Sequence, residues 1–188
     1  MVNLIQGKIR IRTMDLGDAP ALLKWMTDAR VLEFYEGRDK RYTEELIQKD
    51  FFEEDEDIAI KVIIEYGGTP IGYGQIYEMT DECYSHYGYD NQNHAVYGID
   101  QFIGEPDYWN RGIGTEYLKL VLKFLREEKQ ADAVIMDPHQ DNIRAVKCYQ
   151  KAGFRILKSL PEHELHEGKM RDCYLMEYRY QDCHTTTG

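Results

Sequence analysis

A carboxylate interrupts an apolar stretch of the sequence at Asp100. The stretch from Ala95 to Phe102 reads AVYGIDQF, and most of its residues favour a buried β-strand. An unpaired carboxylate is costly to bury, so this one indicates either a structural ion pair with a neighbouring Lys or Arg, or a functional site. Beside a cleft, a carboxylate can accept a proton from a reacting group, and Asp100 is therefore our candidate for a general base.

A glycine-containing segment follows the same strand. Residues 109–115 read WNRGIGT and lead into an amphipathic helix predicted at 112–128. Backbone N–H groups in the first turn of a helix have no intrahelical partners, so they can bind a diphosphate. The alternative is that Gly112 and Gly114 serve only close packing, and a GxG pair does not decide between the two. Because no Lys-Ser/Thr follows the pair, a phosphate-loop nucleotide hydrolase is disfavoured.

A second motif lies at residues 137–154, which read DPHQDNIRAVKCYQKAGF. The pattern predicts a strand end, an Asn-containing turn, a helix over 141–153 and a following strand. Ala145 and Tyr149 lie one turn apart on this helix. Tyr149 also shares a helical stripe with Val146, so ordinary core packing is the alternative to a chemical role.

The rest of the pattern supplies the elements that must position these motifs. Strands are predicted at 8–13, 58–66, 70–79, 95–104, 133–136, 154–160 and 173–180, and further helices after Asp18 and Thr43. Hairpins occur together with strand–helix–strand units. We therefore expect one α+β domain over residues 1–188, with a mixed sheet and helices packed on both faces.

Two polar segments lack hydrophobic periodicity. Residues 81–93 are rich in tyrosine, and we expect a surface loop there that can cover the site as a lid. Residues 163–167 read HELHE, but the histidines are three positions apart rather than four, and Pro161 comes just before them. We expect a loop or short turn at this segment and no metal site, with metal binding as the alternative.

Charge and composition narrow the class of partner. The formal net charge of −11 disfavours nucleic acid, whose phosphates would be repelled, and favours a polycationic small molecule. No apolar run reaches the length of a membrane span, and the first residues lack the apolar core of a signal peptide. We expect a cytoplasmic protein that has no membrane partner and acts as a monomer.

Together, the two motifs resemble the GNAT superfamily of acyl-CoA N-acyltransferases, over nearly the whole chain. The resemblance implies the GNAT fold, with a mixed, mostly antiparallel sheet, and acetyl-CoA as co-substrate without a metal. It implies a pyrophosphate cradle made by Arg111, Gly112, Ile113, Gly114 and Thr115. Trp109 stands where the family usually has Arg or Gln. Asn142 and Ala145 resemble the second cofactor element, where Asn142 contacts the pantetheine arm and Tyr149 protonates the departing thiolate.

Longer segments resemble the aminoglycoside 6′-N-acetyltransferases, and most strongly the acetyltransferase half of the bifunctional acetyltransferase–phosphotransferase. These segments are VYGIDQFIGEPDYW, GIGTEYLKL, DPHQDNIRAVKCYQKAGF and LPEHELHEGKMRDCYLMEYRY. The resemblance implies direct acetyl transfer, in a ternary complex, to the 6′-amino group of kanamycin- or tobramycin-type antibiotics, which confers resistance.

The site residues follow from that resemblance and from the needs of amine acylation. Asp100 would bind the substrate ammonium and take its proton, and backbone N–H groups at Phe102 and Ile103 would polarise the acetyl carbonyl. The further antibiotic contacts we expect are Asp137, Tyr97, Tyr35 and Glu36. Two alternatives stay open: acetylation of a polyamine or a protein N-terminus by the same machinery, and a non-catalytic acyl-CoA-binding sensor.

Overall fold

The strands form one mixed sheet. The computed structural model describes residues 1–53, 59–89 and 95–181. Within them, eight strands pair in the order β1-β2-β3-β4-β5-β6-β8-β7. All neighbours are antiparallel except β5 and β6, which are parallel. The strands are β1 (Asn3–Gln6), β2 (Ile9–Thr13), β3 (Ile60–Tyr66), β4 (Thr69–Glu78), β5 (Val96–Ile103), β6 (Ala133–Met136), β7 (Arg155–His166) and β8 (Lys169–Arg179). The prediction of a mixed, mostly antiparallel sheet is confirmed.

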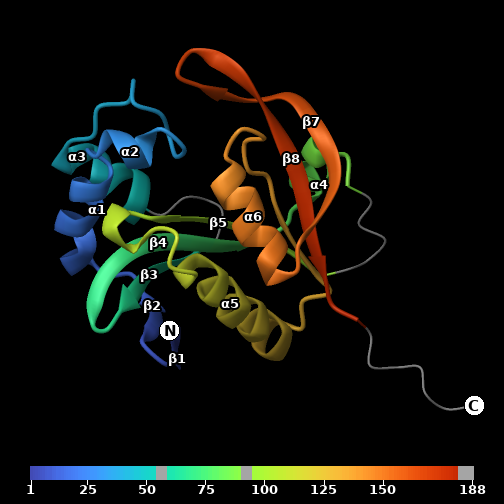
Figure 1. Ribbon diagram of the computed structural model, residues 1–188, viewed down its shortest axis with the longest axis horizontal. Coiled ribbons are helices and arrows are strands. Elements are labelled where there is room, and N and C mark those ends of the chain that lie inside the picture. Colours follow the sequence, from blue (N-terminus) through green and yellow to red (C-terminus); the bar gives the residue numbers. More distant parts are fainter. Residues whose placement is uncertain (54–58, 90–94, 182–188) are drawn as a thin grey trace, which may run out of the picture.

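Helices cover both faces of this sheet (Figure 1). They are α1 (Ala19–Trp25), α2 (Ala29–Leu32), α3 (Glu44–Ile47), α4 (Asp81–Tyr87), α5 (Ile113–Lys129) and α6 (Ile143–Ala152). Alternation along β3 shows the two faces: Val62 and Ile64 pack in the core under α5 and α6, whereas Ile63 packs in the core of α1–α3. None of the helices in the described part of the chain is long and apolar enough to cross a membrane.

The neighbouring strands β5 and β6 pair along only part of their length. Their parallel ladder runs from Val96, opposite Ala133, to Gly98, opposite Ile135, and ends there. From Ile99 onward, that edge of β5 has no strand partner among the described residues. A sheet that opens in this way leaves backbone N–H and C=O groups without partners in the strand ladder, which is the kind of opening that a ligand can fill.

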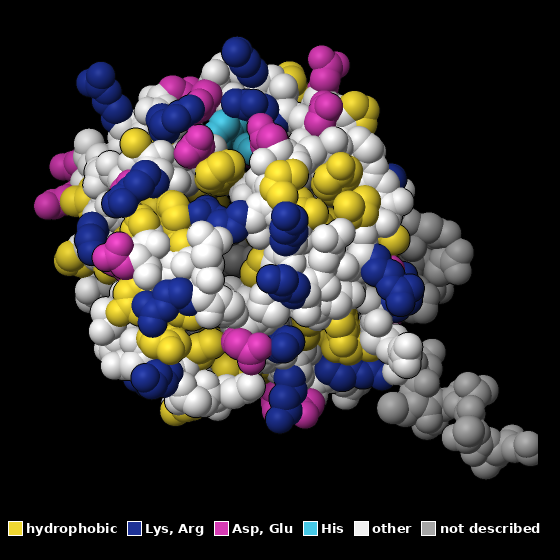
Figure 2. Space-filling model, viewed as in Figure 1, with side chains coloured by type: hydrophobic (Ala, Val, Ile, Leu, Met, Phe, Trp, Pro, Cys, Tyr) yellow, Lys and Arg dark blue, Asp and Glu magenta, His cyan; other side chains and the backbone are white. Residues whose placement is uncertain are grey.

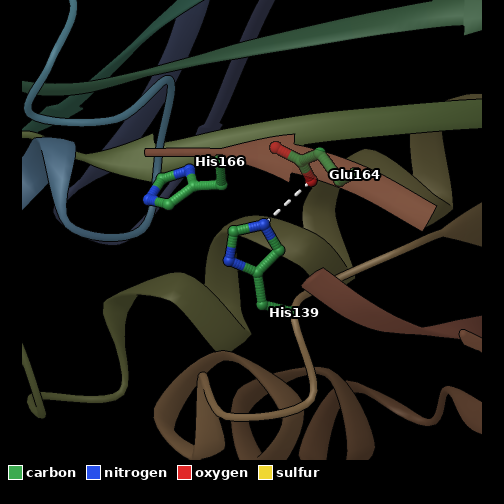
Figure 3. Close-up of side chains that lie close together, drawn as sticks. All are labelled: His139, Glu164 and His166. Carbon is green, nitrogen blue, oxygen red and sulfur yellow. Dashed lines mark hydrogen bonds and ion pairs between the residues drawn. The ribbon is translucent and has the colours of Figure 1, made fainter. Parts of the chain in front are cut away.

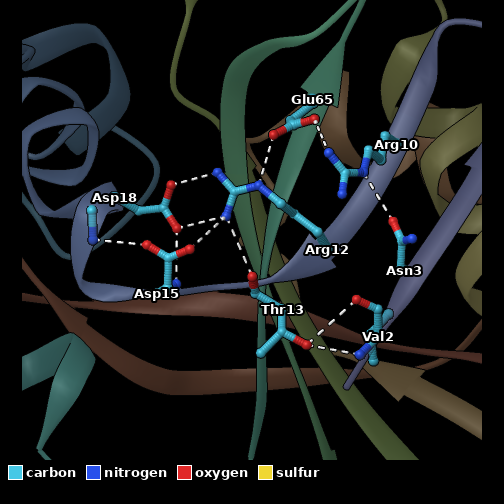
Figure 4. A network of polar contacts seen from close by, with 9 residues as sticks. Val2, Asn3, Arg10, Arg12, Thr13, Asp15, Asp18 and Glu65 are labelled. Carbon is cyan, nitrogen blue, oxygen red and sulfur yellow. Dashed lines mark hydrogen bonds and ion pairs between the residues drawn. The ribbon is translucent and has the colours of Figure 1, made fainter.

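A buried ion cluster fixes the N-terminal strands (Figure 4). The guanidinium of Arg12 donates to both Asp18 oxygens, at 2.8 and 2.6 Å, and to Glu65 Oε1 at 2.7 Å. Asp18 and Glu65 are buried, so Arg12 compensates two carboxylates that have left water. The helix predicted after Asp18 is α1, to which the Asp18 side chain makes no cap bond. That side chain pairs with Arg12 and accepts from the N–H of Asp15 at 2.9 Å.

The two polar segments differ from their predicted structure. Residues 81–87 form α4, capped by Thr80, whose Oγ1 accepts from the N–H of Cys83 at 3.3 Å, so the predicted loop is wrong there. Residues 90–93 of that prediction lie outside the described residues. The loop predicted at 163–167 is also wrong, because 163–166 end strand β7. Most of β7 is exposed on both faces, and the sequence therefore lacks the alternation by which strands are recognised.

The hairpin of β7 and β8 reaches across the molecule to the segment that follows α2 (Figure 1). Arg38 pairs with Glu167 at 2.5 Å, and the ring of His166 contacts the carbonyl oxygen of Glu33 at 3.0 Å. The hairpin end is thereby held above the opening between β5 and β6.

Candidate active site

A cleft of about 980 Å³ lies at the opening between β5 and β6. Its walls come from the end of β5, the first turns of α5 and α6, the loop after β6, the segment after α2 and the hairpin. Figure 2 shows lysine and arginine side chains around a hollow near the centre of one face. Of the predicted site residues, those that line the cleft are Tyr35, Glu36, Asp100, Phe102, Ile103, Arg111, Gly112, Ile113, Gly114, Thr115, Asp137, Asn142, Ala145 and Tyr149.

The first turn of α5 forms one end of the cleft. Gly112 caps the helix at φ +78°, a left-handed conformation that side-chain-bearing residues rarely adopt. A Cβ at Gly114 would lie 3.1 Å from the sulfur of Cys148, so this glycine permits close packing of α5 on α6. One glycine therefore sets the backbone and the other sets the packing. The N–H groups of this turn lack helical partners and lie in the cleft wall, where an anion can bind.

Sequence reasoning missed a set of basic residues on α6. Arg144, Lys147 and Lys151 line the same cleft as Arg111. Their spacing of three and four positions places them on one helical face, a signal that was available in the sequence. Arg144 lies over the ring of Trp109, 3.8 Å from its centroid. This end of the cleft can therefore hold a multiply charged anion such as a diphosphate.

Trp109, which stands at the family's usual Arg or Gln position, braces this end of the cleft. Its indole Nε1 donates to the carbonyl oxygen of Ile103 at 2.7 Å, where β5 ends. Asn142 has a similar local role, because its Oδ1 accepts from the N–H of Ala145 at 3.1 Å and caps α6. Both residues hold backbone that lines the cleft.

Asp100 lies on the cleft wall within a chain of hydrogen bonds. Gln75, directly opposite it on β4, donates from Nε2 to Asp100 Oδ2 at 2.7 Å. Tyr73 in turn donates from its hydroxyl to Gln75 Oε1 at 3.0 Å. No Lys or Arg in the described residues forms an ion pair with Asp100, so the structural alternative of a simple ion pair does not describe it.

The surroundings of Asp100 favour its protonated form more than water does. Burial, and then the negative charge of Asp137, raise the pKa of Asp100 from 3.8 to about 6, against the opposing hydrogen bond from Gln75. A carboxylate with a pKa near 6 is ionised at neutral pH and is a stronger base than an exposed aspartate. Its environment therefore suits proton transfer.

Asp137 is a second carboxylate that lines the cleft with Asp100. Its Oδ2 accepts from the Tyr87 hydroxyl at 3.0 Å and lies 3.2 Å from Nε2 of His163. Tyr87 comes from α4 and His163 from β7, the two segments whose structure the sequence did not indicate. Neither partner was predicted, because residues 50 and 26 positions away in the chain meet Asp137 only in the folded sheet.

Tyr149 lines the cleft from α6. Burial raises the pKa of Tyr149 above its ordinary value, while a hydrogen bond with Gln101 acts in the opposite direction. The hydroxyl is therefore protonated across the physiological range, and it is available to donate a hydrogen bond or a proton to a leaving group in the cleft.

The remaining predicted contacts are divided between the cleft and the core. Tyr35 lines the cleft with its ring centroid 4.6 Å from that of Phe102, and Glu36 lines it while paired with Lys40 at 2.7 Å. Tyr97 is 8% exposed and packs in the core under α5 and α6, outside the residues that line the cleft. Its position gives no support to the predicted antibiotic contact.

The chain is similar to known acetyltransferases. Residues 15–161 match the acetyltransferase (GNAT) domain family. Aminoglycoside N(6′)-acetyltransferase type 1 of Klebsiella pneumoniae is 26% identical over 156 residues, which cover 82% of this chain and 77% of that protein. Spermine/spermidine N(1)-acetyltransferase of Bacillus subtilis (strain 168) is 29% identical over 91 residues, covering 48% of this chain and 56% of that protein.

Solved structures show the same fold. The structure of AAC(6′)-Ib in complex with ribostamycin and coenzyme A matches with a TM-score of 0.74 at 21% identity, and covers 96% of this chain and 100% of that chain. The family match spans most of the sequence and includes β5, α5, β6 and α6 in full. The chain belongs to the GNAT family of acetyltransferases.

Proposed function

We propose that this protein transfers the acetyl group of acetyl-CoA to the 6′-amino group of aminoglycoside antibiotics of the kanamycin and tobramycin type. The observation that carries the proposal is the division of one cleft into a basic end and an acidic end. Arg111, Arg144 and Lys147 come from α6 and the turn before α5, whereas Asp100 comes from β5 and Asp137 directly follows β6. A polyanionic cofactor and a polycationic substrate would each find opposite charge.

The residues present fit coenzyme A at the basic end. The first turn of α5 presents backbone N–H groups, and the left-handed Gly112 lets the chain turn toward a ligand. Arg111 to Thr115 would hold the pyrophosphate, while Asn142 and Ala145 would lie along the pantetheine arm. Acetyl-CoA supplies the activated acyl group, and everything else in the reaction is assigned to the protein and the amine.

Asp100 is the proposed general base. It would bind the 6′-ammonium, accept its proton, and leave the nitrogen lone pair free to attack the thioester carbonyl. The N–H group of Ile103, at the open edge of β5, would stabilise the negative charge that develops on the carbonyl oxygen. The predicted donor at Phe102 instead faces β4, because the N–H of Gly104 donates to Ile71 in the same ladder and N–H directions alternate along a strand. Tyr149 would give its proton to the departing thiolate as the carbon–sulfur bond breaks. The acylated nitrogen would then lose its second proton, which restores the hydroxyl of Tyr149, and Asp100 would release the first to solvent. No covalent enzyme intermediate is required, because the two substrates meet in one cleft.

The acidic end fits an aminoglycoside for a second reason, which is its aromatic lining. Asp137 and Glu36 would pair with further ammonium groups, and Tyr35 and Tyr87 offer ring faces to sugars. The aminoglycoside acetyltransferase relative supports this assignment, since it aligns over most of both chains. We also propose that the protein acts as a monomer in the cytoplasm, where acetyl-CoA is formed.

A polyamine acetyltransferase is the second candidate, because a spermine/spermidine N(1)-acetyltransferase is among the relatives and a polyamine is also a polycation that acidic residues attract. Thiol release should be measured with acetyl-CoA and kanamycin, tobramycin, an aminoglycoside carrying a 6′-hydroxyl, and spermidine. We expect turnover with the 6′-amines, little with the 6′-hydroxyl compound, and a product acetylated at N6′ by NMR. Faster turnover of spermidine would favour the second candidate, and no turnover with coenzyme A binding intact would favour a sensor.

A further inference from the structure

Two histidines and a glutamate converge where the hairpin meets the cleft (Figure 3). His139 follows β6, whereas Glu164 and His166 lie two positions apart near the end of β7 and so share one face of that strand. One potential ligand atom from each residue lies within 4.8 Å of the other two. The imidazole Nε2 of His139 and Glu164 Oε2 are 2.9 Å apart, and the two imidazole rings are nearly perpendicular, at 80°.

His166 carries the observation that points to a ligand. The residue is 2% exposed, and its Nε2 lies 3.0 Å from the carbonyl oxygen of Glu33. Because a carbonyl oxygen can only accept, Nε2 carries the proton and Nδ1 holds the lone pair. That Nδ1 atom is buried and has no hydrogen-bond partner among the described residues. A buried polar atom without a partner costs stability, and its retention calls for an explanation.

The arrangement matches what a histidine needs in order to bind a metal. A ligating imidazole usually donates its other N–H to a carbonyl or carboxylate, which fixes both the tautomer and the ring. Glu33 does this for His166. Figure 3 shows the Nδ1 side of the His166 ring facing Glu164 and His139, with the other ring nitrogen pointing away from them. Two imidazoles and one carboxylate form a ligand set typical of Zn²⁺, with a fourth position open.

We propose that His139, Glu164 and His166 bind a divalent transition-metal ion of the zinc class. Tetrahedral bonds of about 2.0–2.2 Å would bring the three ligand atoms closer together than they lie here. Glu164, whose side chain is 46% exposed, has room to turn from His139 toward the ion. Binding would draw the hairpin end toward the loop after β6.

The proposed ion would change the charge at the acidic end of the cleft. His139 and Glu164 line the same cleft as Asp100 and Asp137, so a bound dication would replace a negative charge with a positive one there. This consequence rests on the proposed function, because it predicts competition with a polycationic substrate. Zinc should raise KM for the aminoglycoside and leave KM for acetyl-CoA unchanged.

Zinc titration calorimetry on the untagged full chain tests binding without any substrate. We expect one Zn²⁺ per chain. His166→Gln keeps an amide donor for Glu33 and removes the Nδ1 ligand, and Glu164→Gln keeps a hydrogen-bonding group beside His139. Each variant should weaken zinc binding by at least about 100-fold, since even outer-shell partners of metal ligands contribute roughly 10–100-fold. His163→Gln, whose ring contacts Asp137 instead, is the matched control and should retain the wild-type zinc affinity.

Cobalt substitution identifies the ligand atoms. Co²⁺ in the proposed site should give visible ligand-field bands without the near-ultraviolet charge-transfer band of a thiolate. Zinc affinity that is equal in the wild type and in folded Glu164→Gln, or a thiolate band that locates the ion at cysteines, would overturn the proposal. Should His166→Gln fail to fold, Glu164→Gln at the exposed edge still decides it. An enzyme that acetylates no aminoglycoside would contradict the proposed function and leave this binding test intact.

Discussion

The two halves of the cleft are built by different means. The cofactor half, called the basic end above, is made from two short segments, 111–115 and 142–151. The first contains the glycine that begins α5, and the second contains the cap of α6 and its basic residues. The substrate half, called the acidic end above, is assembled from β4, β5, β6, α4 and β7. Its carboxylates are held by partners distant in the chain, Gln75 for Asp100 and Tyr87 for Asp137. The proposed anion binding would be a local property of helix starts, whereas the raised pKa of Asp100 depends on burial and on residues distant in the chain, Asp137 and Gln75.

The halves also differ in how they treat charge. Basic residues at the cofactor half lie on the surface of α6, where water moderates their mutual repulsion. Asp100 and Asp137 lie in the cleft wall, where burial and mutual repulsion raise the pKa of Asp100 to about 6. The substrate half therefore stores unfavourable electrostatic free energy that a cationic substrate would release.

The largest effect is expected at Asp100. Asp100→Asn keeps the size of the side chain and removes the proton acceptor, so turnover should fall by about 10²–10⁴-fold. Coenzyme A affinity, a property of the other half, should be unchanged in the same variant. Steady-state kinetics together with calorimetric titration of coenzyme A check both statements. Turnover near the wild-type value in the folded variant would remove the base role.

Tyr149 contributes the proposed acid. Tyr149→Phe should lower kcat by about 10²-fold, at the low end of the range for a positioned acid or base. KM for the aminoglycoside should change little, since the hydroxyl is assigned to the thiolate. Tyr178→Phe, which alters a tyrosine packed against Phe154 outside the cleft, is a suitable control for general loss of packing. Equal losses of kcat in both variants would speak against the assignment.

Removal of the buried charge at Asp100 should make the folded protein more stable at neutral pH. The pKa of Asp100 is raised in the folded state from 3.8 to about 6, so folding is favoured when this group is protonated and is penalised as pH rises through 6. At pH 7.5, Asp100→Asn should therefore raise the free energy of unfolding by up to about 3 kcal/mol relative to the wild type. The gain should disappear near pH 4. Urea denaturation at both pH values measures it, and a less stable variant at pH 7.5 would contradict the electrostatic description.

A change in the cofactor half should be smaller and confined to that half. Arg144→Ala removes one charge-assisted contact, so KM for acetyl-CoA should rise by about tenfold with no change in KM for the aminoglycoside. Lys119→Ala on α5 removes a lysine outside the cleft, paired with Glu116 at 3.0 Å, and serves as the control. Initial rates over both substrate concentrations check this. An equal rise of the two KM values would break the division into halves.

The same division explains what the sequence could predict. The glycine pair before α5 left anion binding and close packing equally open, and the resemblance to the GNAT superfamily assigned residues 111–115 and the segment from Asn142 to Tyr149 to the cofactor. The apolar stretch around Asp100 indicated this residue, because a carboxylate is anomalous in an apolar strand. Tyr87 and His163 were missed, since β7 is exposed on both faces and α4 has little periodicity. Tyr97 and Asp100 lie three positions apart on one strand, so alternation places their side chains on opposite faces, a signal that the sequence already contained.

The acid limb of the pH profile tests the central claim most directly. With Asp100 as base, kcat/KM for a 6′-amino aminoglycoside should fall as pH decreases through about 6, the pKa of Asp100. In Asp137→Asn the repulsion from the second carboxylate is gone, so the pKa of Asp100 and the acid limb should move to lower pH by roughly half a unit to one unit. The ionisation of the free substrate is the same in both measurements. An acid limb that stays at the same pH in Asp137→Asn would contradict the assignment of Asp100 as the base.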